Sequence, residues 1–333
     1  ERGEQEPNRK GAGLEAPAPE EGPAAANRFQ NPVYGKDFPD PNLVKAPDGY
    51  FYAYSTQARR ESGVQIIPIM RSRDLTSWEE LGAALEKKPD WKAEGGIWAP
   101  DAAYYKGLYR LYYSYSTWGD PNPGIGLAVS KQPEGPFRDL GKMFLSKEIG
   151  VDNSIDAFFM EDGGKPYLFW GSFHGIYGVE LSEDGNKVKG EKFRIAGDAY
   201  EGTYILKKGD YYYYFGSTGT CCEGASSTYK VKVGRASSLK GPYLDRDGNP
   251  LLENAGTLLL EGNEAYAGPG HNGDIFSDDR GQDWMLYHAY DKKDPDKGRV
   301  MLLDRISWKD GWPEIAGQQP GLDMQAGPEF RNQ

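Results

Sequence analysis

The sequence predicts an all-β fold, a five-bladed β-propeller, from three observations: a fivefold internal repeat, a high aromatic content and abundant glycine. Aromatic residues make up 13% of the 333 residues and glycine occurs 44 times, a composition that favours short strands joined by tight turns over helices. The repeat decides the architecture, because a pattern that returns along the whole chain is typical of radial or stacked units.

The first part of the repeat is a glycine turn followed by an aromatic-rich run that usually ends near a serine. It occurs at 48–56, 106–116, 164–172, 208–217 and 280–290, with turn glycines at Gly49, Gly107, Gly164, Gly209 and Gly281. Each run has the length and composition of a strand, and each begins at a hairpin turn.

The second part of the repeat reads as a strand, a polar turn and another strand. It occupies 64–82, 124–141, 175–190, 229–245 and 298–315. Units that each hold about four short strands match the blades of a propeller. The alternative, a β-sandwich, does not predict the same two-part order five times, so we expect one propeller domain over residues 29–333.

The composition narrows the choice of partners. Residues 1–28 are rich in Pro, Ala and Glu and nearly free of large apolar side chains, which predicts a disordered leader or tether. The net charge of −11 argues against nucleic acid and anionic membrane surfaces. No run of 18 apolar residues occurs, so we expect no membrane span.

A polar motif stands just before each aromatic run. The five motifs are DFPDPN, IWAPD, NSIDAFF, AYEGTY and GPGHNGD, with the marker residues Asp40, Asp101, Asp156, Glu201 and His271. In a propeller the first strand of every blade lines the central channel. Residues at one equivalent position of five blades should therefore converge on the axis.

Several carboxylates in one small cavity repel one another, so some of their pKa values should rise. Such an arrangement is typical of acid–base chemistry. Phe38 and Trp98 flank two of the motifs and offer flat apolar faces on which a sugar ring can stack. We expect Asp101 to shape this pocket.

The two cysteines, Cys221 and Cys222, are adjacent. Neighbouring Cα atoms are about 3.8 Å apart, closer than in most disulfides, so a vicinal disulfide and a pair of thiols both remain open. The functional interpretation of a vicinal disulfide is a rigid apolar platform under a sugar.

From Asn31 to about Pro313 the sequence resembles glycoside hydrolase family 43, and within it the arabinanase-type enzymes. The run STGTCCEGASSTYKVKVGRASSLKGPYLD at 217–245 is especially similar to such members. The resemblance implies an inverting hydrolase with Asp40 as general base, Glu201 as general acid and Asp156 as the residue that orients the acid and keeps its pKa raised.

The resemblance also implies two further roles. Arg299, in KGRV, would reach a substrate hydroxyl, and His271, in GPGHNGD, would hold an axial Ca²⁺ or a water cluster. Because calcium prefers oxygen ligands, water would complete its coordination. No organic cofactor is implied.

The expected activity is hydrolysis of α-1,5-linked L-arabinan, in endo or exo mode, by a secreted, periplasmic or cell-surface monomer. Its partner would be a neutral plant cell-wall polysaccharide or oligosaccharide. Alternatives within the family are an α-L-arabinofuranosidase, a β-xylosidase or a galactosidase. A non-catalytic carbohydrate-binding propeller is an alternative of another class, and it predicts loss of one or more axial carboxylates.

Overall fold

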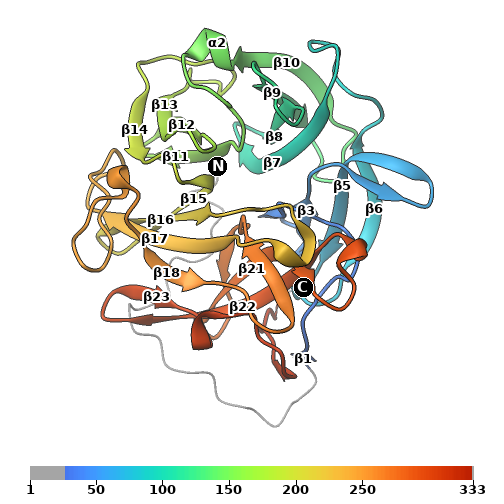
Figure 1. The fold of residues 1–333 in the computed structure, drawn as a ribbon. Helices are drawn as coiled ribbons and strands as arrows, with labels where there is room; N and C mark the ends of the chain where they lie inside the picture. The colour runs from blue at the N-terminus through green and yellow to red at the C-terminus, as the bar shows by residue number, and fades with distance from the viewer. Residues whose placement is uncertain (1–26, 332–333) are drawn as a thin grey trace.

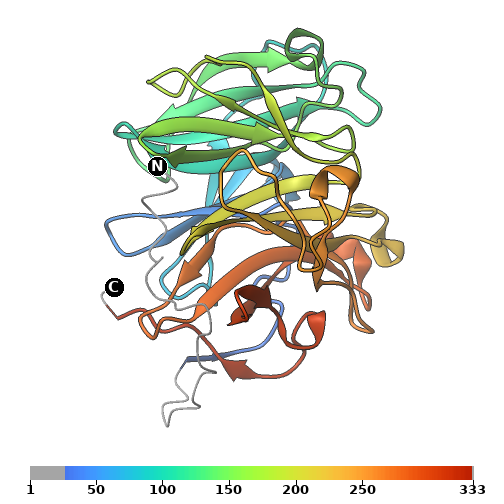
Figure 2. The same cartoon turned by 90° about the vertical axis from the view of Figure 1, so that its left-hand side faces the viewer.

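Five antiparallel sheets are arranged around a central axis in the computed structural model, which describes residues 27–331 (Figures 1 and 2). The predicted five-bladed propeller is confirmed. All but the last two residues of the predicted leader, 1–28, lie outside the described residues. Over the range 27–331, no helix has the length and apolar character needed to cross a membrane.

The blades follow one another along the chain. Blade 1 contains β2 (Asn42–Lys45), β3 (Phe51–Tyr54), β4 (Ala58–Arg60), β5 (Gly63–Ser72) and β6 (Glu79–Leu85). Blade 2 contains β7 (Gly96–Tyr105), β8 (Leu108–Ser116), β9 (Gly124–Ser130) and β10 (Arg138–Leu145). Blade 3 contains β11 (Phe158–Asp162), β12 (Lys165–Trp170), β13 (Ile176–Glu180) and β14 (Phe193–Ala196).

The last two blades hold the remaining sheets. Blade 4 contains β15 (Glu201–Lys208), β16 (Tyr211–Thr218), β17 (Lys230–Ala236) and β18 (Thr257–Leu260). Blade 5 contains β19 (Tyr266–Gly270), β20 (Ile275–Ser277), β21 (Asp283–Asp291), β22 (Arg299–Lys309) and β23 (Trp312–Glu314). Outside the blades lie β1 (Arg28–Phe29), β24 (Gln325–Ala326), the helix α2 (Ser146–Ile149) and short 3-10 turns at Gly224–Ser226, Leu251–Glu253, Pro295–Lys297 and Ala316–Gln318.

The five aromatic runs form the second strand of each blade, which lies inside its sheet and packs against both neighbouring blades. Most of their rings are fully buried. Tyr112 of blade 2 stacks on Phe159 of blade 3, with ring centroids 5.3 Å apart, and Tyr213 of blade 4 meets Trp308 of blade 5 edge to face at 4.9 Å. Large rings supply much apolar area per residue, so these contacts hold the blades together.

In four blades a residue in the left-handed region of backbone space lies in or beside the first strand, at what we call the entrance position. These residues are Asp40, Ala99, Asp156 and His271, with φ of 55°, 41°, 63° and 45°. Each donates its N–H to a side chain on, or just after, the second strand of the preceding blade, over 2.9, 2.7, 3.0 and 2.9 Å. The acceptors, in the same order, are His288, Thr56, Ser114 and Ser217. This bond offsets the cost of the left-handed backbone and explains why the aromatic runs end near a small polar residue.

Blade 4 departs from this rule by one residue. Its left-handed position is taken by Gly202 (φ 64°), so Glu201 stands one place earlier than the other marker residues. The Gly202 N–H donates to Asp156 Oδ2 at 3.2 Å. This hydrogen bond fixes the start of blade 4 relative to the Asp156 side chain of blade 3.

The ring is closed by the N-terminal segment, which lies along β22 of the last blade. The Phe38 N–H donates to the Arg299 carbonyl at 2.9 Å. The Asn31 side chain pairs with both backbone groups of Leu303, donating to its carbonyl at 3.1 Å and accepting its N–H at 2.9 Å. The segment that ends at Asp40 is thus registered against the strand that begins at Arg299.

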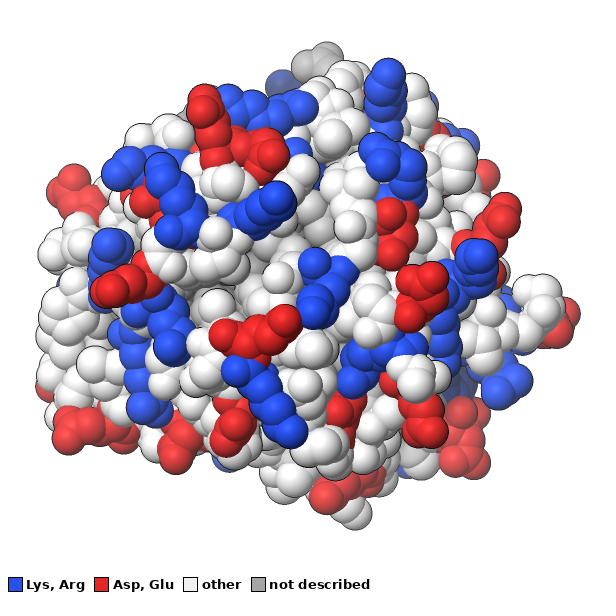
Figure 3. All heavy atoms as spheres, turned by 90° about the horizontal axis from the view of Figure 1, so that it is seen from above, with Lys and Arg blue, Asp and Glu red and all other residues white. Residues whose placement is uncertain are grey.

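Positive and negative side chains are interspersed on the face of the molecule in Figure 3, without a large field of one sign. The excess of acidic groups is therefore not gathered into one patch on this face.

Removing the amide that closes the ring should destabilise the fold. Asn31→Ala leaves the N–H and carbonyl of Leu303 without this partner, and we expect a loss of about 2 kcal/mol of unfolding free energy. Urea titration of both proteins measures it. Gln30→Ala is the matched control: its amide bonds the Leu322 carbonyl from an exposed site, so its effect should stay within about 0.5 kcal/mol. Equal losses in the two variants would contradict the closure role.

Candidate active site

One cavity of about 240 Å³ receives side chains from all five blades. It is lined by Asp40, Thr56, Trp98, Ala99, Thr117, Trp118, Gly119, Asn153, Ile155, Asp156, Ser172, Phe173, Glu201, Cys221, Cys222, His271 and Arg299. The convergence expected from the repeat thus holds for four of the five marker residues.

Two residues expected at the site are not among the cavity's lining residues. Asp101 is 1% exposed, and its Oδ2 accepts the Phe159 N–H of blade 3 at 2.7 Å. Ala99 occupies the left-handed entrance position in blade 2, so Asp101 lies two residues further on, where blade 1 has Asn42. Asn42 likewise accepts the N–H of Ala102 in the next blade at 2.8 Å. Asp101 therefore links blade 2 to blade 3 through this hydrogen bond.

Phe38 is the second such residue. It is completely buried and packs edge to face on Tyr34, with ring centroids 5.9 Å apart. Its ring belongs to the core between the first and last blades. The structure therefore places it behind the wall of the cavity.

Asp40 is surrounded by donors and cations. Thr56 Oγ1 donates to its Oδ2 at 2.5 Å, while His271 Nδ1 lies 2.9 Å and an Arg299 nitrogen 3.5 Å from its Oδ1. Burial alone would raise the pKa of Asp40, but Arg299 and His271 together hold it well below its ordinary value of 3.8. Asp40 is therefore a carboxylate at neutral pH.

The two histidines next to Asp40 carry different charges. Burial opposes protonation of His271, but the Asp40 carboxylate and the other site carboxyls raise its pKa to about 9. Burial lowers the pKa of His288 well below 6.5, and its Nδ1 accepts the Asp40 N–H at 2.9 Å. His271 is thus an imidazolium, and His288 is neutral with its proton on Nε2.

Asp156 and Glu201 form the opposite pole of the cavity. Burial raises the pKa of Asp156 to about 8, and the neighbouring Glu201 charge adds to the rise. Burial also raises the pKa of Glu201, against hydrogen bonds from Ser172 and Tyr229 that lower it. Two adjacent buried carboxyls with raised pKa values retain a proton between them near neutral pH.

The surroundings of His271 do not support the metal role expected for it. Among residues 27–331, no three His, Cys, Asp or Glu side chains gather as metal ligands, and His271 Nδ1 is directed at Asp40. An imidazolium lacks the lone pair that binds a metal. The expected axial calcium remains a prediction, and no step below relies on it.

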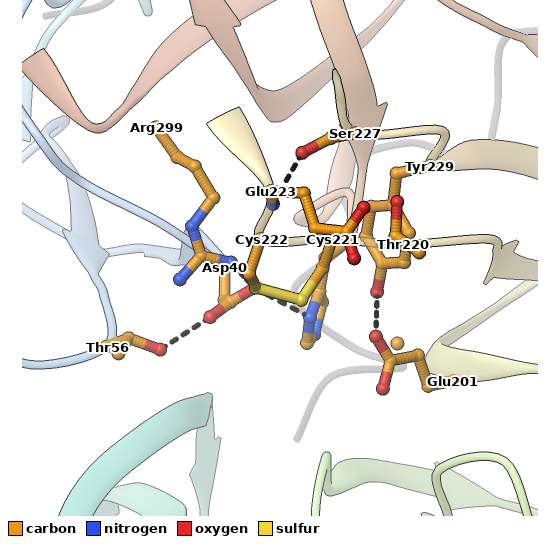
Figure 4. The surroundings of a disulfide bond; sticks show 12 residues. Asp40, Thr56, Glu201, Thr220, Cys221, Cys222, Glu223, Ser227, Tyr229 and Arg299 are labelled. Atoms are coloured by element: carbon orange, nitrogen blue, oxygen red, sulfur yellow. Dashed lines mark hydrogen bonds and ion pairs between the residues drawn. A yellow bond between two sulfur atoms is a disulfide. The ribbon is translucent and has the colours of Figure 1, made fainter. Parts of the chain in front are cut away.

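A disulfide joins Cys221 and Cys222 on the wall of the cavity. Figure 4 shows it with Asp40 and Arg299 on one side and Tyr229 and Glu201 on the other. The loop that carries it is tied at its base, because the N–H of Thr220 and the N–H of Thr228 each donate to the other's hydroxyl at 2.9 Å. The disulfide therefore sits on a closed, fixed loop.

Several cavity or site residues have no strong signal in the sequence. Trp118 is 76% exposed and packs on Trp98 at 5.5 Å between ring centroids, and Phe173 is also exposed. Ser172 and Tyr229 hydrogen-bond the two oxygens of Glu201, each at 2.6 Å. The only available hint was the serine at the end of the aromatic runs, which places Ser172 beside the next blade.

Comparisons with known proteins identify the family of this chain. The family model described as glycosyl hydrolases family 43 matches residues 29–313. An extracellular endo-α-(1→5)-L-arabinanase of Bacillus subtilis is 34% identical over 292 residues, covering 82% of this chain and 86% of the relative. An extracellular exo-α-(1→5)-L-arabinofuranosidase of Cellvibrio japonicus is 32% identical over 310 residues, covering 84% and 86%.

Solved structures give the same picture. An α-L-arabinanase of Cellvibrio cellulosa in complex with arabinohexaose superposes with a TM-score of 0.74 at 30% identity, covering 84% of this chain and 95% of its own. An exo-1,5-α-L-arabinanase from a bovine ruminal metagenomic library gives 0.74 at 32% identity, covering 86% and 99%.

The charged pair of His271 and Asp40 should make stability depend on pH. The folded pKa of His271, about 9, lies above the ordinary 6.5, so its contribution is complete below about pH 6.5 and disappears as the pH rises through 9. We expect the stability advantage of the wild type over His271→Gln to shrink by up to about 3 kcal/mol between pH 6.5 and 9.5, measured by urea unfolding. A pH-independent difference would contradict the charge assignment. The exposed His174→Gln is the control and should show no such trend.

Proposed function

The chain belongs to glycosyl hydrolases family 43, and from this premise we propose that it is an arabinanase that hydrolyses α-1,5-linked L-arabinan with inversion of configuration. The observation that carries the mechanism is the separation of charge within one cavity. Asp40 is ionised beside two cations, whereas Asp156 and Glu201 hold a proton. An inverting hydrolase needs one carboxylate and one carboxylic acid on the two sides of the scissile bond.

In this mechanism Asp40 is the general base. It would accept a proton from the water that attacks the anomeric carbon. Thr56, His271 and Arg299 hold its oxygens in place and keep it deprotonated. Arg299 also lines the cavity, where its guanidinium is available to a substrate hydroxyl.

Glu201 is the general acid in the same scheme. It would give its proton to the glycosidic oxygen as the bond to the anomeric carbon breaks. Asp156 lies on the neighbouring blade and accepts the N–H of Gly202, the residue after Glu201, at 3.2 Å. It therefore orients the acid, and because ionisation of one buried carboxyl disfavours ionisation of the other, the pair retains a shared proton.

Apolar surface at the cavity supports binding of a sugar chain. Trp98 and the exposed Trp118 form an aromatic pair at the cavity, and the Cys221–Cys222 disulfide supplies a second apolar wall. The relatives include both an endo-acting and an exo-acting enzyme. Analysis of the products released from arabinan therefore determines the mode of cleavage. The same two names describe extracellular enzymes and support secretion of this protein.

The first test is turnover of debranched arabinan by the wild type, Asp40→Asn and Glu201→Gln. The wild type should release arabino-oligosaccharides if endo-acting and arabinose alone if exo-acting. Each variant should lose about a thousandfold or more in kcat, since each removes one half of the acid–base pair. No product from the wild type, or full activity in either variant, would contradict the proposal.

Asp101→Asn is the matched control for these two variants. Asp101 is a buried carboxylate of a neighbouring motif, but it is not among the lining residues of the cavity. Its amide can still accept the Phe159 N–H, so kcat on arabinan should stay within about threefold of the wild type.

The disulfide platform gives a separate prediction. Cys221→Ser combined with Cys222→Ser replaces an apolar wall with two hydroxyls, and we expect KM for arabinan to rise about tenfold with kcat little changed. Ala225→Ser places the same hydroxyl on the same loop at an exposed position and serves as control. An unchanged KM in the double variant would rule out the platform.

A further inference from the structure

Tyr229 links the disulfide loop to the proposed general acid. It follows directly on the tied loop, and its N–H donates to the Thr220 carbonyl at 3.0 Å. Its hydroxyl donates to Glu201 Oε2 at 2.6 Å, and the side chain is 1% exposed. Ser172, on the preceding blade, donates to the other oxygen, Oε1, at 2.6 Å. Both oxygens of Glu201 are therefore held by hydroxyl donors.

The ring of Tyr229 has little freedom to move. It stacks on His288 with centroids 5.8 Å apart and planes 8° from parallel. On another side it meets Gly270, where an added Cβ would come within 2.3 Å of the ring. Backbone, imidazole and glycine thus fix the direction in which the hydroxyl points.

The same contact reaches the proposed base. His288, on which Tyr229 stacks, accepts the Asp40 N–H with its Nδ1 at 2.9 Å. One rigid pair of rings therefore bonds to Glu201 at one end and to the backbone of Asp40 at the other. Such a pair fixes the separation of the two carboxyls across the substrate.

We propose that Tyr229 is a positioning residue of the reaction: its hydroxyl, together with that of Ser172, aims Glu201 and stabilises the carboxylate that forms when its proton leaves. This inference rests on the proposed role of Glu201 as general acid.

The gain comes in the transition state. As the glycosidic C–O bond breaks, its electron pair passes to the leaving oxygen, which takes the Glu201 proton. The oxygen of the attacking water forms the new bond to the anomeric carbon, and a proton of this water passes to Asp40. Glu201 gains negative charge during this step. Hydrogen bonds to an ionised acceptor are about twice as strong as bonds to a neutral one, so both hydroxyls bind the transition state better than the ground state.

The test compares leaving groups. Wild type, Tyr229→Phe, Ser172→Ala and Glu201→Gln are assayed on α-1,5-arabinobiosides of 4-nitrophenol and 2,4-dinitrophenol and on debranched arabinan. The dinitrophenolate departs without help from an acid, whereas the sugar alkoxide needs a proton. For Tyr229→Phe we expect kcat/KM on arabinan to fall roughly 10- to 100-fold, with less than about a threefold change on the dinitrophenyl substrate.

Tyr213→Phe is the matched control. It also removes a buried hydroxyl from blade 4, one that donates to the Gly311 carbonyl at 2.7 Å, away from the carboxyls. It should show no dependence on the leaving group. A loss in Tyr229→Phe that is equal on all substrates, or no loss, would overturn the positioning role.

Glu201→Gln separates failure of this inference from failure of the proposed function. If Glu201 is the acid, this variant shows the same dependence on the leaving group in a stronger form. Should Glu201→Gln lack that dependence, the assignment of the acid is wrong. If Glu201→Gln shows it and Tyr229→Phe does not, only the role of Tyr229 is wrong.

Discussion

The site depends on one repeated hydrogen bond between neighbouring blades. In four blades the residue at the entrance position, in or beside the first strand, adopts a left-handed backbone, and its N–H bonds a side chain on or just after the second strand of the blade before it. A left-handed conformation is unfavourable for residues other than glycine and persists only where the surroundings fix it. Here that bond fixes it, and as a result Asp40, Asp156 and His271 come from separate blades to one cavity. The contacts that join neighbouring blades therefore also set the geometry of the site.

Asp40, Asp156 and Glu201 are all buried, but their pKa values shift in opposite directions because their neighbours differ. Asp40 shares its surroundings with Arg299 and His271, so the cost of its desolvated charge is offset and its pKa falls. Desolvation raises the pKa of both Asp156 and Glu201, and the negative charges of neighbouring carboxylates add to the rise. The carboxylate of Asp40 keeps the His271 imidazole cationic, and this cation in turn stabilises the ionised form of Asp40. A base and an acid thus coexist in one small cavity at neutral pH.

The sequence was sufficient for the architecture and for most of the site. The fivefold repeat predicted the blades, and its register brought together Asp40, Asp156, Glu201 and His271. The prediction that Asp101 shapes the pocket did not gain support, because spacing to the turn glycine cannot separate a strand entrance from a position two residues later. Asp101 precedes Gly107 by six residues, whereas the true entrance, Ala99, precedes it by eight. Only the backbone conformation distinguishes the two. The hydroxyls on Glu201 were also missed, since a tyrosine in a tyrosine-rich strand protein gives no sign of the residue it contacts.

The glycines of GPGHNGD leave space for the segment that carries Tyr229. At Gly268 and Gly270 of this motif, an added Cβ would collide with the segment that carries Tyr229. At Gly268 the collision is with Ser227 at 2.6 Å, and at Gly270 it is with the Tyr229 ring itself. Blade 5 therefore supplies His271, which contacts the base Asp40. Because Gly268 and Gly270 have no side chains, it also leaves the space through which Tyr229 reaches the acid Glu201. The motif contributes to both sides of the reaction, which explains why glycine is needed on the strand just before His271.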